Sequence, residues 1–175
     1  MRASPIHLQI TQTWDGCAID PSERINLRLS QRAGDLIVSV DAPFHGDPRP
    51  QGPPGPTDGL WHHEVVELFI AGADKRYLEI ELGPYGHHLV LQLSDIRTPS
   101  ATRLPIHYTA ERHGERWSGE AQIPCHLLPV GPHRINATAI FGAPGARRHL
   151  SICTLPGAEP DFHQPAHFPI HARLI

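Results

Sequence analysis

Hydrophobic and polar positions alternate through the middle of the chain, from residue 60 to residue 93. Residues 64–70, 77–82 and 88–93 each follow this period of two, which indicates half-buried β-strands. Short links that contain glycine separate the three segments, as is usual in hairpins. The pattern therefore predicts three successive antiparallel strands.

This alternation divides the three strands into an apolar face and a polar face. We expect the apolar face to lie in the core; it comprises Val66, Leu68, Ile70, Leu78, Ile80, Leu82, Leu89, Leu91 and Leu93. The opposite face comprises Val65, Glu67, Phe69, Tyr77, Glu79, Glu81, His88, Val90 and Gln92. If residues of one face pair directly, Glu67 lies near Glu79. Glu81 then lies near His88, so three carboxylates and an imidazole share one patch.

Like charges opposed across strands repel, so something must offset the three carboxylates of this patch. Water and surface arginines such as Arg76 or Arg97 would do so on an exposed face. A ligand site would do so through the hydroxyls of a sugar, a divalent cation, or a proton transfer with one carboxyl kept protonated. The residues alone leave both interpretations open.

Further short strands are predicted along the rest of the chain. Alternation predicts them over residues 7–14, 25–30, 36–40, 104–109, 117–123, 135–141 and 150–155, and the end of the chain is irregular except for a candidate strand at 170–174. Residues 124–128 are compatible with a single helical turn. About nine or ten short strands separated by turn signals are typical of an all-β fold of the antiparallel β-sandwich or jelly-roll type.

Residues 42–59 are too rich in proline and glycine for regular structure and too polar for a core. A flexible linker between domains is one interpretation. The flanking strands look like parts of one sheet system, so we favour a long loop folded over a single domain of residues 1–175. Loops of this length are often either functional or disordered.

Composition narrows the function classes. A chain of 175 residues with 39% hydrophobic and 19% charged residues is typical of one soluble globular domain. A net charge of −3 without a long basic run argues against nucleic-acid binding. No apolar run could span a membrane, and the N-terminus lacks the apolar core of a signal peptide, so we expect a cytoplasmic protein. Scattered Cys17, Cys125 and Cys153 indicate reduced thiols without a zinc spacing. The oligomeric state does not follow from the sequence.

Aromatic side chains are candidates for sugar contacts, because a pyranose ring stacks its C–H face on an aromatic plane. Trp14 and Trp61 lie at strand ends beside loops, where each is either a ligand platform or a lid over the edge of the core. Trp117 alternates with Gly119 and Ala121, which favours core packing.

Three more polar residues are of interest. Glu64 falls on the core-face parity, so its carboxylate needs an arginine or backbone N–H partner, and we interpret it as a structural anchor. Asp161 and His163 lie two apart in an irregular segment, so they point the same way if it is extended. They either cap a loop or join the patch of Glu67, Glu79, Glu81 and His88, where they would help to bind a divalent ion or act as acid and base.

Several motifs resemble one family of uncharacterised proteins, which includes a human open-reading-frame product and many bacterial members. They are TWDG (13–16), DAPF (41–44), LWHHEVVELF (60–69), YLEIELGPYGHHLVL (77–91) and PDFH (160–163). The match spans nearly the whole chain in the same order. Since the family itself has no assigned role, the resemblance implies little about function.

A more distant resemblance covers chiefly the middle third. The tryptophan followed by Glu-Val-Val-Glu-Leu-Phe is similar to the core of family-nine carbohydrate-binding modules. Those modules are β-sandwiches, often with calcium, that hold a sugar between tryptophans. The resemblance implies a saccharide or glycoside ligand, with Trp14 and Trp61 as clamp candidates, although we expect neither a secretion signal nor an attached glycosidase for this chain.

The leading hypothesis is non-catalytic binding of a small polar ligand such as a saccharide or glycoside. The candidate ligand-binding residues are Trp61, Trp14, Glu67, Tyr77, Glu79, Glu81, His88, Asp161 and His163. The alternative is a small cytosolic enzyme, an isomerase, cyclase or hydrolase, with the candidates Glu81, Glu79, His88 and His163. A structural or protein-interaction domain is the third hypothesis. A divalent metal ion is the one cofactor that these residues would suit. No phosphate-cradling glycine loop, Gly-x-Ser-x-Gly or nicotinamide fingerprint is present.

Overall fold

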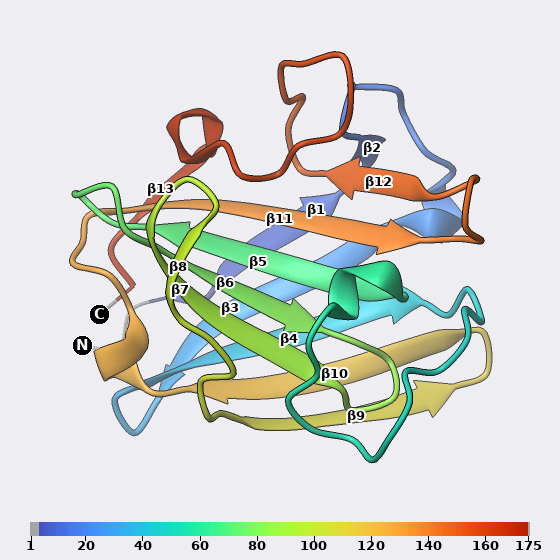
Figure 1. Ribbon diagram of the computed structural model, residues 1–175, viewed down its shortest axis with the longest axis horizontal. Helices are drawn as coiled ribbons and strands as arrows, with labels where there is room; N and C mark the ends of the chain where they lie inside the picture. Colours follow the sequence, from blue (N-terminus) through green and yellow to red (C-terminus); the bar gives the residue numbers. More distant parts are fainter. Residues whose placement is uncertain (1–3, 175) are drawn as a thin grey trace.

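The computed structural model describes residues 4–174, which form two antiparallel β-sheets packed face to face (Figure 1). The first sheet has the strand order β1 (Ile6–Ile10), β3 (Ile25–Arg32), β4 (Asp35–Pro43), β10 (Arg116–Ile123), β9 (His107–His113). The second has the order β2 (Gln12–Thr13), β12 (Arg148–Ser151), β11 (His133–Phe141), β5 (Val65–Ala71), β6 (Tyr77–Leu82), β7 (His88–Asp95), β8 (Thr98–Ala101), and β13 (Ile170–Ala172) also pairs with β11. The predicted all-β antiparallel sandwich is confirmed.

The predicted strands are present, with shifted ends. Residues 7–14 divide between β1 and β2, and the strand predicted over residues 150–155 is the short β12, which ends at Ser151. Strand β8 was not expected, because it contains Pro99 and lacks alternation; it lies at a sheet edge, where a proline is tolerated. Four short 3-10 helices complete the described elements: η1 (Pro21–Glu23), η2 (Leu60–His62), η3 (Cys125–Leu127), which is the expected turn, and η4 (Pro165–His167). Within residues 4–174, no helix has the length and apolar character needed to cross a membrane.

The main hydrophobic core lies between the two sheets. It combines Leu27 and Val38 of the first sheet with Leu68 and Ile80 of the second, and all four side chains are at most 2% exposed. Burying each such side chain contributes about 1.5–3 kcal/mol to the free energy of unfolding. Trp117 is 1% exposed in the same core, as its alternation with small residues indicated.

The predicted parity is correct for β5 and β6 and wrong for β7. On β5 and β6, Leu68 pairs with Ile80, so the apolar residues share the inner face, toward the first sheet. On β7, however, Val90 pairs with Ile80 and His88 pairs with Leu82, which places these two residues on the inner face as well. Gln92 joins them there, and the residues that face outward are Leu89, Leu91 and Leu93. The alternation predicted the wrong orientation of β7 because both of its faces carry apolar residues, and each face packs in one of the two apolar clusters.

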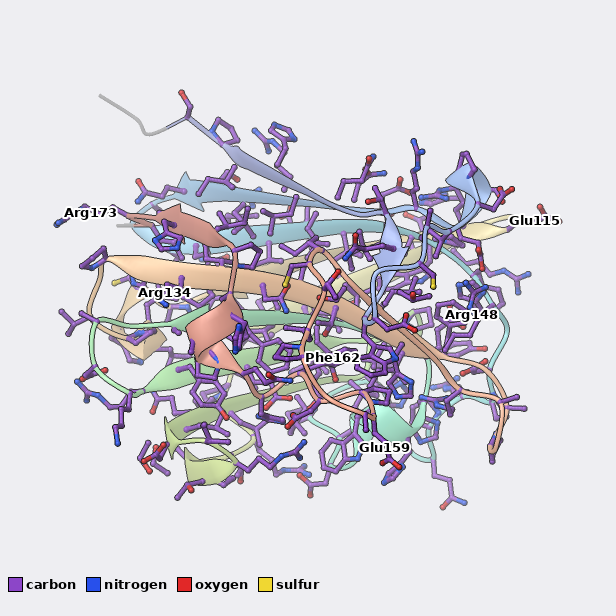
Figure 2. The ribbon with its side chains drawn as sticks, turned by 90° about the horizontal axis from the view of Figure 1, so that it is seen from above. Glu115, Arg134, Arg148, Glu159, Phe162 and Arg173 are labelled. Carbon is purple, nitrogen blue, oxygen red and sulfur yellow. The ribbon has the colours of Figure 1, made fainter. Side chains whose placement is uncertain are left out.

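The outer face of the second sheet is buried too, which excludes the interpretation of this face as an exposed polar surface. Every residue of β5 and β6 is buried. A second apolar cluster covers this face, in which Phe69 of β5 packs with Leu155, Phe162 and Phe168 of the C-terminal segment. Figure 2 shows the part of this segment that carries Glu159 and Phe162 lying across the strands. Water and surface arginines therefore do not account for the glutamates.

Glu64 anchors the proline- and glycine-rich loop, as its position on the core-face parity indicated. Its carboxylate accepts hydrogen bonds from the backbone N–H groups of His45 (2.9 Å), Gly46 (3.1 Å) and Asp47 (3.4 Å). The Asp47 carboxylate in turn accepts from Arg147 at 3.0 Å. These bonds hold the start of the loop against β5 and β11.

Further along, the same loop is hydrogen-bonded to β7. The backbone N–H of Thr57 donates to the His88 carbonyl at 2.8 Å, and the His88 N–H donates to the Gly55 carbonyl at 3.0 Å. The loop leads directly into η2, which carries Trp61. Its attachment at both ends therefore fixes the position from which Trp61 projects.

Candidate functional site

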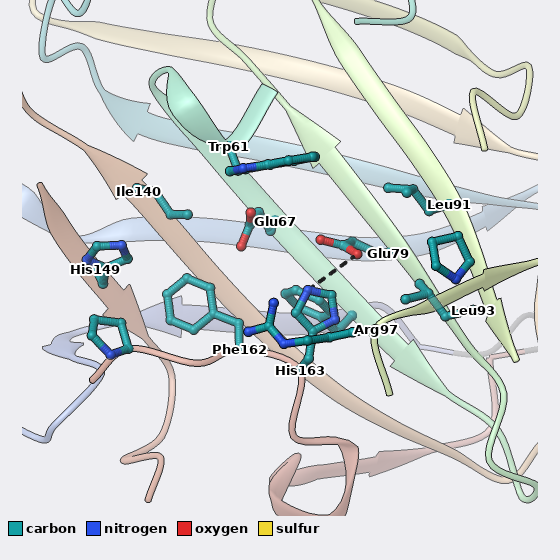
Figure 3. A pocket seen from close by; sticks show the side chains of 13 residues that line it. Trp61, Glu67, Glu79, Leu91, Leu93, Arg97, Ile140, His149, Phe162 and His163 are labelled. Carbon is teal, nitrogen blue, oxygen red and sulfur yellow. Dashed lines mark ion pairs between the residues drawn. The ribbon is translucent and has the colours of Figure 1, made fainter. Parts of the chain in front are cut away.

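The outer face of β5, β6 and β7 contains a cavity of about 370 Å³ (Figure 3). This volume lies at the small end of the range for ligand pockets, about 300–1,000 Å³. The lining residues are the acids Glu67 and Glu79, the basic residues Arg97, His149 and His163, the aromatic residues Trp61, Phe69 and Phe162, and the apolar residues Leu91, Leu93, Pro99, Ile140 and Pro160. The cavity thus joins aromatic planes to a few charged groups.

Trp61 is the exposed aromatic of this site, with 44% of its surface accessible. It lies on η2, which begins after Gly59 at a φ of +69°, a left-handed conformation that glycine adopts without strain. Arg147 donates to the Trp61 carbonyl at 2.9 Å and so fixes the backbone. In Figure 3 the indole lies on one side of the two lining glutamates, and Phe162 lies on the other.

The three glutamates come together, as the sequence predicted. Glu67 of β5 pairs directly with Glu81 of β6, and Glu79 lies on the same face of β6, two residues earlier. One carboxylate oxygen of each residue lies within 4.8 Å of the others. The direct cross-strand partner of Glu67 is Glu81 rather than Glu79, so the detailed pairing differs from the expected one.

These glutamates are almost completely inaccessible to solvent. Glu67 is 2% exposed, Glu79 6% and Glu81 0%. Thr138 Oγ1 donates to Glu67 Oε2 at 2.7 Å, whereas neither carboxylate oxygen of Glu81 has a hydrogen-bond partner among the described residues. The Glu81 carboxyl therefore gives up hydration without receiving a well-formed hydrogen bond in return, and the nearby Trp61 backbone offsets this cost only in part.

Burial is the main cause of raised pKa values in this cluster. It raises the pKa of Glu67 to about 7, against the opposing effects of the Thr138 hydroxyl and the Arg147 charge. Burial and the neighbouring Glu67 charge raise the pKa of Glu79 to about 8. Burial, followed by the charges of Glu67 and Glu79, holds the pKa of Glu81 well above its usual value, against a smaller opposing effect of the Trp61 backbone. Three buried carboxylates thus disfavour one another's ionised forms.

His163 joins the cavity through a short hydrogen-bonded chain. Its Nδ1 lies 2.8 Å from Tyr77 Oη, which also accepts from the backbone N–H of Arg97 at 3.1 Å. Its Nε2 lies 3.9 Å from Glu79 Oε2, the contact dashed in Figure 3. Burial and the Arg97 charge lower the pKa of His163 to about 4, so the ring is neutral at neutral pH and this contact is not a full ion pair. Asp161 accepts from Arg97 at 2.8 Å and from the His163 N–H at 2.9 Å, which is the loop-capping role.

Comparison with known proteins identifies the family. No protein-family model matches the chain. It is 37% identical over 168 residues to the UPF0462 protein C4orf33 homolog of Danio rerio, covering 91% of this chain and 85% of the relative. It is 35% identical to the UPF0462 protein C4orf33 of Homo sapiens, covering 89% and 82%. The chain belongs to the UPF0462 (C4orf33) family. The resemblance to a family with a human open-reading-frame member is confirmed.

The fold of this UPF0462 chain is similar to that of other proteins of known structure. A candidate carbohydrate-binding protein from Bacteroides uniformis superposes with a TM-score of 0.72 at 16% identity, over 93% of this chain and 84% of that one. A carbohydrate-binding module of family 9 from Caldicellulosiruptor kristjanssonii, in complex with glucose, gives a TM-score of 0.55 at 13% identity, over 82% and 72%. At such identities the likeness establishes the β-sandwich fold and not the ligand.

The structure separates His88 and Trp14 from the UPF0462 cavity. His88 faces inward, where its ring lies 5.7 Å from that of Tyr108, so the predicted contact with Glu81 is wrong. The reason is the inverted parity of β7. Trp14 does not line the cavity and packs at the edge of the outer-face apolar cluster, which is the lid alternative. Tyr77 supports His163 through its hydroxyl and does not line the cavity either.

Several cavity residues were not predicted as site residues. Phe162 was expected only to anchor the tail, and Arg97 only as a surface arginine, yet both line the cavity. The PDFH motif was the one signal that marked Phe162. Ile140 of β11 pairs with Val65 of β5, far away in sequence, and His149 of β12 pairs with Ile140, so both reach the cavity through a distant pairing for which the local pattern carries no signal.

Proposed function

We propose that this chain binds a small saccharide, without catalysis, in the cavity on the outer face of β5, β6 and β7. The observation that carries the proposal is the combination of exposed Trp61 with the two lining carboxylates of Glu67 and Glu79. A pyranose ring has apolar C–H faces and a rim of hydroxyls, so it suits a site that offers an aromatic plane and hydrogen-bond acceptors together.

The wall opposite Trp61 strengthens the match to such an amphipathic ligand. Phe162 supplies a second aromatic side chain across the cavity, and Arg97 supplies a donor for ring or hydroxyl oxygens. Bonds between sugar hydroxyls and Glu67 or Glu79 would form in a desolvated environment, where each is stronger than in water. The walls thus complement both faces and the rim of one sugar ring.

The size of the cavity favours a mono- or disaccharide over a long polysaccharide, since about 370 Å³ lies near the lower limit of ligand pockets. The family-9 module that shares the fold was solved with glucose, and a related structure of the same type was solved with cellotriose. These neighbours support D-glucose and cellobiose as the first probes.

Isothermal titration with D-glucose and cellobiose tests the proposal. We expect the wild type to bind, and Trp61→Ala to weaken binding at least tenfold, about 1.4 kcal/mol, because the stacking plane is lost. Trp14→Ala is the matched control, since it removes a tryptophan that does not line the cavity. A wild type that binds no member of a panel of mono- and disaccharides, or a Trp61→Ala variant with unchanged affinity, would contradict the proposal.

An acid–base enzyme is the second candidate function, and one specific observation favours it. Of the predicted catalytic residues, Glu79 and His163 meet inside the cavity with 3.9 Å between Oε2 and Nε2. Glu81 does not line the cavity and His88 faces the other side of the sheet. A time course by NMR with the bound sugar tests this candidate. Chemical change of the sugar that Glu79→Gln abolishes would establish it, and an unchanged spectrum would exclude it for that sugar.

A further inference from the structure

We propose that Glu67, Glu79 and Glu81 together bind one hard divalent cation, of the class of Ca²⁺, Mg²⁺ or Mn²⁺, at the inner end of the cavity. The proposal concerns the ion alone and does not depend on saccharide binding. It is carried by the geometry of the three carboxylates, by the unpartnered carboxylate of Glu81, and by the lack of a compensating basic side chain.

The carboxylate oxygens are close enough to share an ion. One oxygen from each glutamate lies within 4.8 Å of the others. Ligands on opposite sides of a Ca²⁺ ion, each about 2.4 Å from it, are about 4.8 Å apart, and adjacent ligands are closer. The three side chains can therefore reach a common ion without a change in the strands.

The strand register holds these ligands in place. Glu67 and Glu81 are direct partners in the β5–β6 pair, and Glu79 follows on the same face because alternate residues of a strand point the same way. Strand β5 is flanked by β11 and β6, and β6 by β5 and β7, so neither strand is at a sheet edge. The carboxylates thus project from the most constrained part of the second sheet.

Glu81 supplies the second, independent observation. Its side chain is 0% exposed, and both of its carboxylate oxygens lack a hydrogen-bond partner within the described chain. Burying a carboxylate without a partner is costly, and buried polar groups in folded proteins are almost always satisfied. A cation held with Glu67 and Glu79 would be the missing partner, since an oxygen of Glu81 already faces theirs.

No basic side chain within residues 4–174 is hydrogen-bonded to Glu81, and the charges of Arg147 and Arg97 act on Glu67 and Glu79 without a hydrogen bond to either. The two nearby arginines are engaged elsewhere, Arg97 with Asp161 at 2.8 Å and Arg147 with Asp47 at 3.0 Å. Carboxylate oxygens are hard ligands that suit Ca²⁺, Mg²⁺ and Mn²⁺ better than soft metals. Glu67 and Glu79 also line the cavity, so water can enter and complete the coordination shell.

Cation titrations test the site directly. The protein is treated with EDTA, freed of chelator, and titrated calorimetrically with CaCl₂, MgCl₂ and MnCl₂ near neutral pH. We expect at least one of these cations to bind with one ion per chain and to raise the Tm, because a ligand of the native state stabilises it. Glu81→Gln should weaken that binding at least tenfold. Glu120→Gln, an exposed glutamate of β10 paired with Arg32, is the matched control and should bind as the wild type does.

Circular dichroism and the cation-free Tm verify that Glu81→Gln, which nearly preserves side-chain shape, remains folded. A measurement on the wild type needs no variant: crystals grown with MnCl₂ should give an anomalous peak among the three carboxylates. The proposal is overturned if the wild type binds none of the three cations, or if Glu81→Gln binds them equally well. Since no sugar is present, that failure would leave the saccharide proposal untouched.

Discussion

The two faces of β5 and β6 are both buried, yet they are built differently. The inner face presents only apolar side chains such as Leu68 and Ile80 to the opposing sheet. The outer face of the same two strands presents Glu67, Glu79 and Glu81 to an irregular C-terminal segment, with a cavity left between them. Burial alone therefore does not distinguish core from site; what matters is whether the buried groups are satisfied.

The energetic consequences of the two faces are opposite. Removing apolar side chains from water stabilises the fold, whereas burying unpaired carboxylates costs free energy. A face that only had to close the fold would be more stable with leucines in place of the acids. The outer face thus carries groups that stability does not explain, and this is the physical basis for treating it as a ligand site.

The largest predicted effect is a difference in the free energy of unfolding between truncations on the two faces. Leu68→Ala, at an inner-face position that is 1% exposed, should lower the free energy of unfolding by about 2–5 kcal/mol, because it leaves a cavity between the sheets. Leu91→Ala, at a half-buried position that already borders the outer cavity, should cost only about 1 kcal/mol. Urea denaturation measures both values, and equal losses would break the comparison.

The second prediction concerns the unsatisfied acid. Glu81→Leu should raise the free energy of unfolding by about 1–4 kcal/mol in EDTA, because it replaces a buried, unpartnered carboxyl by an apolar side chain of similar size. Chemical denaturation with and without the cation that binds the wild type gives the measurement. A variant that is less stable than the wild type in EDTA would show that the carboxyl contributes to folding itself.

Sequence patterns revealed the gathering of the acids, because the parity of β5 and β6 is unambiguous. They did not reveal the orientation of β7, because Leu89, Val90 and Leu91 are consecutive apolar residues. Either orientation of the strand therefore places an apolar side chain on the inner face. Glu64 was recognisable as an anchor, since a carboxylate at a core-face position needs partners. The structure shows these partners as three backbone N–H donors.

The covering of the outer face could not be predicted in the same way. Phe162 and Phe168 belong to an irregular segment that lies 93 and 99 residues after Phe69 at these two positions, and no local periodicity encodes contacts at such distances in sequence. The cavity depends on this covering, so its existence also had to come from the three-dimensional structure. Only the motif around residues 160–163 pointed to that segment.

The smallest predicted effect concerns the histidine that the inverted parity placed on the inner face. Burial lowers the pKa of His88, so below about pH 6.5 the unfolded chain takes up a proton that the folded chain resists. This group therefore makes the fold less stable as the pH falls. His88→Leu should remove that contribution, so the stability of the variant relative to the wild type should rise between about pH 7 and pH 5, by less than about 1 kcal/mol near pH 6. If the free energy of unfolding of the two proteins changed with pH in the same way, the inward placement of His88 would be contradicted.

The most direct test of the ligand site uses two of the three tryptophans as internal reporters. Protein labelled with ¹⁵N is titrated with D-glucose, and the indole N–H resonances are followed by NMR. Trp61 lines the cavity and is 44% exposed, whereas Trp117 is 1% exposed in the inner core. We predict that the Trp61 resonance shifts and saturates while the Trp117 resonance stays in place. A Trp61 resonance that does not move over a panel of mono- and disaccharides, or that moves no more than Trp117, would contradict the assignment of the outer face as a saccharide site.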